Sequence, residues 1–563
     1  MGIVKKPWAR RVVLSRRVCG VAAAIVLTAS AAGAQPPSTA AASVPIPLTL
    51  GDAIKMALDK NLDIAVQRLN PQLDDFSLAR AKASYLPTVS SLIGDQHQTA
   101  VPITLLTGGQ QVTTTTGTVN GQLTQHMPWA GGHLNISWDN NRVFSNSFFY
   151  NYNPAFNASV SAQYTQPLMR GLHTDRARQV LAVTKVNREI SALQLQTTIT
   201  NTVTNVRNAY WDLVRAVESI DIAKTSVDLA HQLVTDGQAR VEAGTMTRLD
   251  LITATSQEAN ERHTRVVAEG SRRTAELALK RLVVGGPDDP IWRAVIDPVD
   301  RPDVKPQTVD LDAARKRALN ERTDLAQAKQ QAAANDATRQ YLRDQTRPQA
   351  DLVAGYALAG LGGTQLIRGG DPQSLTSFTA PIVGTIPGSY GGALSTLAGH
   401  NYPTWSVAVN ITYPLGYSAA KADAARAQIQ EAQVVAQMRQ IEVQVITEVT
   451  NTAIAIRNAA DEIETARQAS DLAVQKLDAE QQKFAVGRST NYLVVQAQKD
   501  MTDARTAVLQ AEIAYQKALA DFERAQQTTL QSAGVTVISP NTMDAAVGSG
   551  LPAAPAPSGS FIP

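Results

Sequence analysis

Apolar residues recur every three or four positions through much of this chain, a spacing that predicts long amphipathic helices. The clearest run lies within residues 170–243, where apolar side chains keep a heptad repeat. Its members are Ile199, Val203, Val206, Tyr210, Leu213, Val217, Ile220, Val227, Val234 and Val241. A weaker run, rich in small residues, covers 446–484. Because Gly244 and Gly487 interrupt the helical pattern and a new one follows each, we expect two helical hairpins.

Between the helical runs, apolar and polar residues alternate, which predicts β-strands. Segments 156–165 and 350–358 alternate clearly, and the region after Pro87 does so more weakly. The apolar positions of a further segment are Trp405, Val407, Val409, Ile411 and Tyr413. Each clear segment is about ten residues long, as a tilted strand across a bilayer requires, and its apolar face would then contact lipid. A half-buried strand of a soluble sandwich shows the same alternation.

The strands also limit how the chain can enter a membrane. After residue 34 no run approaches the ~18 apolar residues of a spanning helix, so only a closed β-barrel is possible. Four strands are too few, because a barrel needs about eight, and we expect several chains to share one. Residues 123–138 predict an extra hairpin that either widens the barrel or decorates it. The glycine-rich segment 359–404 predicts a long external loop.

The chain contains an internal repeat. At a constant offset of 261, residues 48–94 match residues 309–355 at ten positions without a gap. A second offset of 243 pairs Gly244 with Gly487 and Arg262 with Arg505. Chance similarity between alanine-rich helices is the alternative explanation. Two registers in the same order favour a duplicated unit of helices and strands.

These patterns divide the chain into six segments. They are a signal peptide (1–34), a flexible linker (35–47), a first repeat (48–285), a linker (286–308), a second repeat (309–527) and a low-complexity tail (528–563). The first repeat is expected to hold strands at 86–168 and helices at 172–243 and 246–284; the second is expected to hold a helix at 309–347, strands at 348–415 and helices at 417–486 and 489–527. Pro71 is expected to kink or break the first helix.

Residues 1–34 have the features of a cleaved secretory signal peptide: a basic start, an apolar run from Val18 to Ala32 and a small-x-small ending. A short membrane anchor is the alternative, but the run is shorter than the ~20 residues of a spanning helix. Cleavage removes six basic residues and changes the formal net charge from +3 to −3. It also removes Cys19, the only cysteine, so we expect no disulfide in the exported chain.

The residue types that carry chemistry form no recognisable site. Phosphate loops, zinc-protease helices and nucleophile elbows are all missing from the sequence. The seven histidines have no metal-ligand spacing, and the exported chain has no basic stripe for nucleic acid. Aromatic residues make up only 5%, which is few for several enzyme cores. We therefore expect no catalytic residue, no metal and no cofactor, and no nucleic acid as a partner.

Short segments recur in a characteristic order. They are residues 48–58 with 61–62, 86–87, 166–168 with 413–415, 209–213 and 240–245. In these segments, and in its duplication and signal peptide, the chain resembles the TolC-type outer membrane efflux protein family over residues 48–527. The resemblance implies an α+β membrane protein with long coiled-coil α-helices. It also implies a homotrimer, whose 12-stranded outer-membrane β-barrel continues as a periplasmic α-helical barrel in a Gram-negative bacterium.

The resemblance also implies partners and site residues. In the family the hairpin tips contact a periplasmic adaptor (membrane fusion) protein, which joins the channel to an inner-membrane pump. The matching tip residues are Ala243, Gly244, Thr245, Val486, Gly487 and Arg488. Asp250 matches a gate position, although an acid in the first turn of a helix is also favoured by the helix dipole alone. Some members carry a ring of aspartates where this chain has Leu493 and Gln496.

We therefore expect a passive exit duct of a tripartite efflux or type I secretion system, set in the lipid of the outer membrane. The pump would supply the energy, and this chain would supply a water-filled path with a gate at its tip. A periplasmic or surface coiled-coil protein with a structural or adaptor role is the main alternative, but two hairpins with paired amphipathic strands argue against it. A secreted hydrolase would need a nucleophile or base cluster that the sequence lacks.

Overall fold

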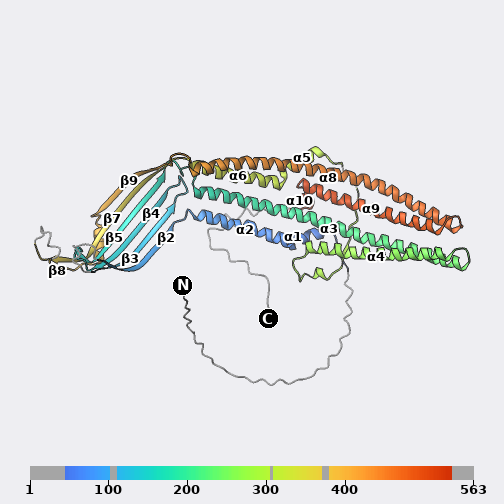
Figure 1. Ribbon diagram of the computed structural model, residues 1–563, viewed down its shortest axis with the longest axis horizontal. Coiled ribbons are helices and arrows are strands. Elements are labelled where there is room, and N and C mark those ends of the chain that lie inside the picture. The colour runs from blue at the N-terminus through green and yellow to red at the C-terminus, as the bar shows by residue number, and fades with distance from the viewer. Residues whose placement is uncertain (1–44, 102–110, 303, 305–307, 371–379, 536–563) are drawn as a thin grey trace, which may run out of the picture. The chain divides into compact units, whose positions relative to one another are not determined.

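The computed structural model describes residues 45–101, 111–302, 304, 308–370 and 380–535. The predicted signal peptide and most of the predicted C-terminal tail lie outside these residues. The described chain consists of long helices and a large antiparallel sheet, which confirms the expected fold class of helices combined with strands (Figure 1). None of the helices in this part of the chain combines the length and the apolar character needed to cross a bilayer.

The helices form two equivalent sets, in agreement with the sequence repeat. The first set is α1 (Leu50–Lys60), α2 (Leu62–Ala83), α3 (Arg176–Glu242) and α4 (Arg248–Val283), and the second is α5 (Leu311–Glu321), α6 (Thr323–Asp344), α8 (Ala419–Ala485) and α9 (Asn491–Ala525). The first two helices of each set start 261 residues apart, and the last two start 243 apart. The long helices α3 and α8 have 67 residues each, or about 100 Å.

Each copy divides its first helical segment in two, at a place that the sequence did not indicate. The sequence predicts a kink or break at Pro71 and one helix over 309–347. The break falls instead at Asn61, whose side-chain oxygen accepts hydrogen bonds from the backbone N–H groups of Asp63 (3.0 Å) and Ile64 (3.2 Å). Arg322 occupies the equivalent position. Helix α2 continues through Pro71, because its packing on α3 offsets the loss of one backbone hydrogen bond.

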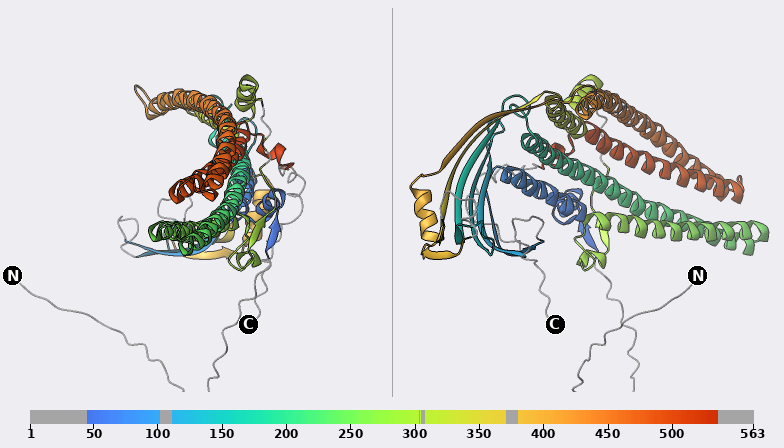
Figure 2. Two further views of the ribbon diagram at one scale, coloured as in Figure 1. Left: turned by 90° about the vertical axis from the view of Figure 1, so that its right-hand side faces the viewer. Right: turned by 60° about the vertical axis from the view of Figure 1, so that its left-hand side comes forward.

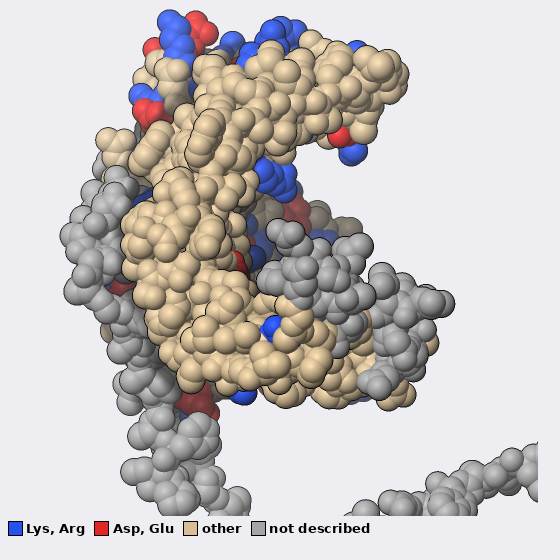
Figure 3. Space-filling view, turned by 90° about the vertical axis from the view of Figure 1, so that its left-hand side faces the viewer, with Lys and Arg blue, Asp and Glu red and all other residues tan. Residues whose placement is uncertain are grey.

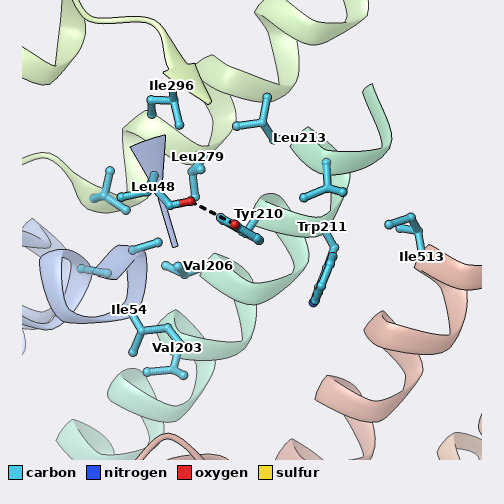
Figure 4. Close-up of a cluster of buried hydrophobic side chains, with 14 of the residues drawn as sticks. Leu48, Ile54, Val203, Val206, Tyr210, Trp211, Leu213, Leu279, Ile296 and Ile513 are labelled. Atoms are coloured by element: carbon cyan, nitrogen blue, oxygen red, sulfur yellow. Dashed lines mark hydrogen bonds between the residues drawn. The ribbon is translucent and has the colours of Figure 1, made fainter. Parts of the chain in front are cut away.

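The middle of the helical region is held by buried apolar side chains from several elements (Figure 4). Tyr210 of α3 lies at the centre, and its hydroxyl donates a hydrogen bond to the backbone carbonyl of Leu48 at 3.0 Å. Burial raises the pKa of the Tyr210 hydroxyl, so that it stays a neutral donor. Ile54 of α1, Leu279 of α4 and Ile513 of α9 belong to the same cluster.

Segments assigned to linkers and to the tail contain ordered elements. The predicted linker 35–47 ends in β1 (Ile46–Leu48), which pairs in parallel with β6 (Ile296–Pro298) from the predicted linker 286–308. That second linker also contains the 3-10 helix η2 (Pro290–Trp292), and the start of the predicted tail forms α10 (Thr529–Ser532). A few buried apolar residues, Leu48, Ile296 and Leu530, anchor these segments to the core.

The large sheet has more strands than the four that alternation indicated. Its strands are β2 (Thr88–Ala100), β3 (Val112–His126), β4 (His133–Ser145), β5 (Tyr152–Pro167), β7 (Gln349–Arg368), β8 (Ile382–Ile386) and β9 (Pro403–Thr412). In the described residues they follow the order β2–β3–β4–β5–β7, and β8 and β9 pair with the remaining edge of β7 (Figures 1 and 2). The extra hairpin is β3–β4, which lies between β2 and β5. A run of threonines, residues 113–116, hid its first strand because threonine suits both faces of a strand.

The segment 359–404, expected to be a loop, is partly regular. Strand β7 continues into it, and α7 (Tyr390–Ala398) packs across the far end of the sheet. Glycines make this possible: a Cβ at Gly360 would lie 2.1 Å from the carbonyl oxygen of Ala393, and one at Gly362 would lie 2.4 Å from its nitrogen. The glycines that suggested a loop therefore leave room for a helix on a strand.

Candidate hairpin tips and exposed sheet face

The first hairpin tip is closed by a glycine in the left-handed region. Helix α3 ends at Glu242, and Gly244 has φ of +72°. The N–H of Gly244 donates to the carbonyl of Val241 at 3.0 Å, and the N–H of Thr245 donates to that of Arg240 at 2.9 Å. These two bonds define a Schellman motif, which satisfies the last carbonyls of the helix.

The second tip repeats this geometry. Gly487 has φ of +75°, and its N–H donates to the carbonyl of Phe484 at 3.2 Å. The N–H of Arg488 donates to the carbonyl of Lys483 at 2.8 Å. Val486 is 70% exposed, and no atom beyond the glycine and its chain neighbours lies within 4 Å of a Cβ built at either tip glycine. Both tips therefore project into open space in the described chain.

Asp250 belongs to the cap of α4. The Thr247 hydroxyl accepts the backbone N–H of Asp250 at 3.2 Å and donates to its carboxylate at 2.6 Å, a reciprocal capping arrangement. Asp250 thus has the local role that its first-turn position suggested, and a further role as a gate stays a proposal. Leu493 is 45% exposed, and Gln496 donates to the Asp500 carboxylate at 2.7 Å.

The two hairpins contact one another close to their tips. Asn491, the first residue of α9, donates from its side-chain nitrogen to the backbone carbonyl of Asp250 at 2.9 Å. The Arg240 guanidinium lies over the Phe484 ring at 4.4 Å from its centroid. A small apolar cluster, which includes Val234 of α3 and Val494 of α9, lies behind these contacts. Close to the tips the hairpins are therefore joined by the bond from Asn491, by a longer bond of 3.5 Å from the Arg240 guanidinium to the carbonyl of Ala485, by a cation–π contact and by a small apolar core.

The predicted lipid-facing residues form one exposed face. Trp405, Val407, Val409 and Ile411 occupy alternate positions of β9, and each is more than half exposed. Tyr413 lies just after the strand and is 46% exposed. Their register partners on β7 are the apolar residues Tyr356, Ala354, Leu352 and Ala350. Because paired residues share a face of a sheet, the apolar surface continues across both strands.

Charged side chains are sparse on the sheet. They are Asp95, Asp139, Arg142, Asp351 and Arg368, and Figure 3 shows that the sheet end of the described chain is mostly free of charge. His231 of α3 is largely exposed and lies 3.0 Å from the Glu258 carboxylate. In the described residues no group of acidic, histidine or cysteine side chains could hold a metal ion.

A known family covers both copies of the repeat. The family described as "Outer membrane efflux protein" matches residues 53–285 and, separately, residues 314–526. The chain belongs to the outer membrane efflux protein family. The two separate matches also account for the duplication. No curated protein sequence matches the chain.

Solved structures share the fold of this outer membrane efflux protein at low sequence identity. A membrane protein from Pseudomonas aeruginosa is 15% identical with a TM-score of 0.62, and the match covers 85% of this chain and 90% of that one. The outer membrane protein VceC from Vibrio cholerae is 13% identical with a TM-score of 0.60, over 85% and 95% of the two chains. The open-state MtrE outer membrane channel of Neisseria gonorrhoeae is 16% identical with a TM-score of 0.57, over 85% and 89%.

Two features of this efflux protein were not singled out from the sequence. The bond from Asn491 to Asp250 joins residues that are 241 positions apart, and no local sequence pattern predicts such a contact. The second feature is a stripe on α2, here called the α2 stripe, whose members are Leu62, Val66, Leu69, Leu73 and Phe76. Its alternating spacing of four and three was visible as a heptad pattern, but only the structure shows that these residues are more than half exposed.

Proposed function

We propose that this efflux protein is a homotrimeric exit duct of the outer membrane, through which an inner-membrane pump and a periplasmic adaptor pass their cargo to the outside. Its strands would close a barrel in the membrane, and its helices would continue the path through the periplasm. The observation that carries this proposal concerns edges. In the described chain, both the sheet and the layer of helices have outer edges that no other element covers.

The sheet edges support ring closure by copies of the same chain. Strands β2 and β9 each pair on one side only in the described residues. Long unpaired edges promote association, and a closed barrel removes them. The chain leaves α2 through β2 and returns through β9 to α8, so β2 of one chain and β9 of the next would run antiparallel.

The helical layer has matching edges. Helix α2 packs on α3, α3 on α6, and α6 on α8, which puts α2 and α8 at the two ends of this row (Figure 2). The α2 stripe lies on one end, and α8 exposes Ile429 and Val443 at the other. Contiguous exposed apolar surface of this kind is typical of an interface. We propose that the α2 stripe of one chain packs against α8 of its neighbour.

The faces of the sheet support a membrane location. The apolar face with Val409 would contact lipid, while the opposite face of β9, with Ser406 and Asn410, would line the water-filled path. The helical hairpins would then extend into the periplasm. This arrangement suits passive passage.

The hairpin tips are the proposed adaptor contacts and gate. Gly244 and Gly487, with Ala243, Thr245, Val486 and Arg488 beside them, would dock into the adaptor. The bond from Asn491 to Asp250 would help to hold the hairpins together in the closed state. An adaptor that binds the separated arrangement more tightly would shift the population toward an open gate.

The size of the detergent-extracted protein tests the proposal. Envelope fractionation should recover the full chain with the outer membrane, and native mass spectrometry should give three copies per particle. Planar bilayers containing the purified protein should show ion conductance. Recovery as a soluble periplasmic monomer would overturn the proposal and favour the coiled-coil alternative.

Cross-linking from a photoreactive residue at Arg488 in intact cells should capture an adaptor, and the same residue at Arg262 on the shaft of α4 serves as the control.

A further inference from the structure

The β3–β4 hairpin is built into the sheet rather than attached to its surface. Strand β3 pairs with β2 along its length, from Thr88 opposite Thr124 to Ala100 opposite Val112. Strand β4 pairs with β5 from His133 opposite Thr165 to Val143 opposite Ala155. In the described residues β2 and β5 do not pair with one another, because the hairpin separates them. Without the hairpin, β2 and β5 would have to pair with one another to keep the sheet continuous.

The apolar face and the polar face of the sheet both continue onto the hairpin. On the apolar face Trp138 of β4 pairs with Val160 of β5, and Val160 pairs with Leu358 of β7. On the polar face Ser137 pairs with Ser161, and their hydroxyl oxygens lie 2.8 Å apart. The apolar surface of β9, β7 and β5 therefore continues without a shift onto the hairpin.

Neutral polar side chains bind one another across the other face. Gln122 of β3 donates to the side-chain oxygen of Asn135 on β4 at 3.0 Å. Asn157 of β5 donates to that of Asn141 on β4 at 2.7 Å. These bonds join neighbouring strands on the polar face, which would line the proposed water-filled path. A hairpin that lay outside the barrel would not need them. They indicate that the hairpin lines the path.

Polar residues at the far end of the apolar face have a protein partner. Asn140 continues this face beyond Trp138, and it accepts a hydrogen bond from the Tyr390 hydroxyl of α7. The Tyr390 ring also meets Phe156 of β5 edge-on, with centroids 6.1 Å apart. Helix α7 thus covers the end of the face where the hairpin becomes polar, and the stretch from Leu134 to Trp138 remains for lipid.

We propose that each chain contributes six strands, β2, β3, β4, β5, β7 and β9, to the barrel, so that a trimer closes eighteen strands instead of the twelve that the family resemblance implies. This inference rests on the proposed trimeric duct. Six strands alternate in direction, so β9 still meets the next β2 antiparallel and the ring closes without a mismatch. Barrel diameter grows roughly linearly with strand number, so the membrane path would be about 1.5 times as wide as with twelve strands.

Electron cryomicroscopy of the purified full chain tests the strand number directly. Eighteen strands in the membrane cross-section support the inference. A trimer with twelve strands and the hairpin outside them would overturn it and leave the proposed duct intact. A monomer without a barrel would overturn both.

Engineered cysteine pairs test the same pairing in intact cells. Ile93→Cys with Val119→Cys, and Trp138→Cys with Val160→Cys, replace register partners and should cross-link within one chain on mild oxidation. The pair Ile93→Cys with Val160→Cys joins strands that the hairpin separates and should not react. Cross-linking of this control pair, without the other two, would contradict the proposed wall.

Deletion of residues 112–145 tests the consequence for width. The variant should still be a trimer, because the α2 stripe is unchanged, but its barrel should have twelve strands. Polymers added from the outer side should be excluded at a smaller size than in the full chain. Unchanged polymer exclusion in a variant that is still a trimer would overturn the inference, and failure of the variant to assemble leaves the decision to the cysteine pairs.

Discussion

The side chain of Asn491 reaches the backbone carbonyl of Asp250 at 2.9 Å, although the two residues belong to different copies of the repeat. Asn491 is only 5% exposed, and its side-chain oxygen has no hydrogen-bond partner among the described residues. Packing alone does not explain a buried amide side chain that makes a single hydrogen bond. We infer that this bond restrains the second hairpin against the first.

Replacement of Asn491 by alanine should loosen the hairpin tips. Loss of one buried hydrogen bond costs about 1–2 kcal/mol, which is roughly a 5- to 30-fold change in the ratio of closed to open tips. In planar bilayers the Asn491→Ala variant should conduct more than the parent protein. Asn451→Ala, at an exposed position of α8, is the matched control and should conduct like the parent. Equal conductance of Asn491→Ala and the parent would show that this bond does not restrain the tip.

The effect of a substitution at Gly244 should depend on the backbone conformation that the new residue tolerates rather than on the size of its side chain. Gly244 has φ of +72° and open space around its Cβ position, so alanine meets only the conformational cost, about 1–2 kcal/mol. Asparagine tolerates this region better and should cost less. Limited proteolysis at the tip should therefore be fastest for Gly244→Ala, intermediate for Gly244→Asn and slowest for the parent. If the asparagine variant were cleaved faster than the alanine variant, the cost would not lie in the left-handed conformation.

The α2 stripe should be needed for assembly. Leu69 is 54% exposed in the single chain and would be buried in the proposed trimer. Leu69→Glu places a charge in that interface, and burying an unpaired carboxylate costs several kcal/mol. Native mass spectrometry should show loss of the trimer. Gln72→Glu adds the same charge at an exposed position outside the stripe and should leave the trimer intact. A stable trimer with Leu69→Glu would exclude this surface from the interface.

Local sequence patterns made the tips and the repeat predictable, whereas contacts between distant parts of the sequence could not be predicted. Gly244 was readable because a helix end followed by a new helix requires a left-handed residue. The break at Asn61 was missed because proline at 71 is the stronger local signal, while Asn61 also depends on a distant partner, the carbonyl of Leu282 at 2.9 Å. Strand β3 was hidden by its threonines, although β4 could be recognised from Leu134, Ile136 and Trp138.

Acid should weaken the contact between α1 and the segment after α4. Asp289 accepts hydrogen bonds from the backbone N–H of Ile291 (3.1 Å) and from Lys60 (3.0 Å), and these hold the pKa of its carboxyl below the ordinary value of 3.8. Because the folded pKa is the lower one, the stabilisation is fully present above pH ~4 and is lost as the pH falls through the folded pKa.

Hydrogen exchange of residues 285–298 should therefore accelerate at low pH beyond the intrinsic effect of pH. In the Asp289→Asn variant this extra acceleration should disappear. Asp288→Asn, at the exposed neighbouring position, should behave like the parent. A parent-like pH response in Asp289→Asn would show that another group controls this segment.

Charge on the two faces of β9 should have unequal effects on membrane assembly. Val409 pairs with Leu352 on the apolar face, whereas the adjacent residue Asn410 pairs with Asp351 on the other. An arginine that faces lipid near the middle of the bilayer costs roughly 2–4 kcal/mol, while one that faces water can stay hydrated. Val409→Arg should therefore lower the amount of folded trimer in the outer membrane, and Asn410→Arg, beside the Asp351 carboxylate, should not. Urea extraction of membranes followed by quantification of the retained trimer compares the two. Because both variants carry the same charge at adjacent positions of one strand, equal retention would show that the strand does not present these two faces to lipid and water.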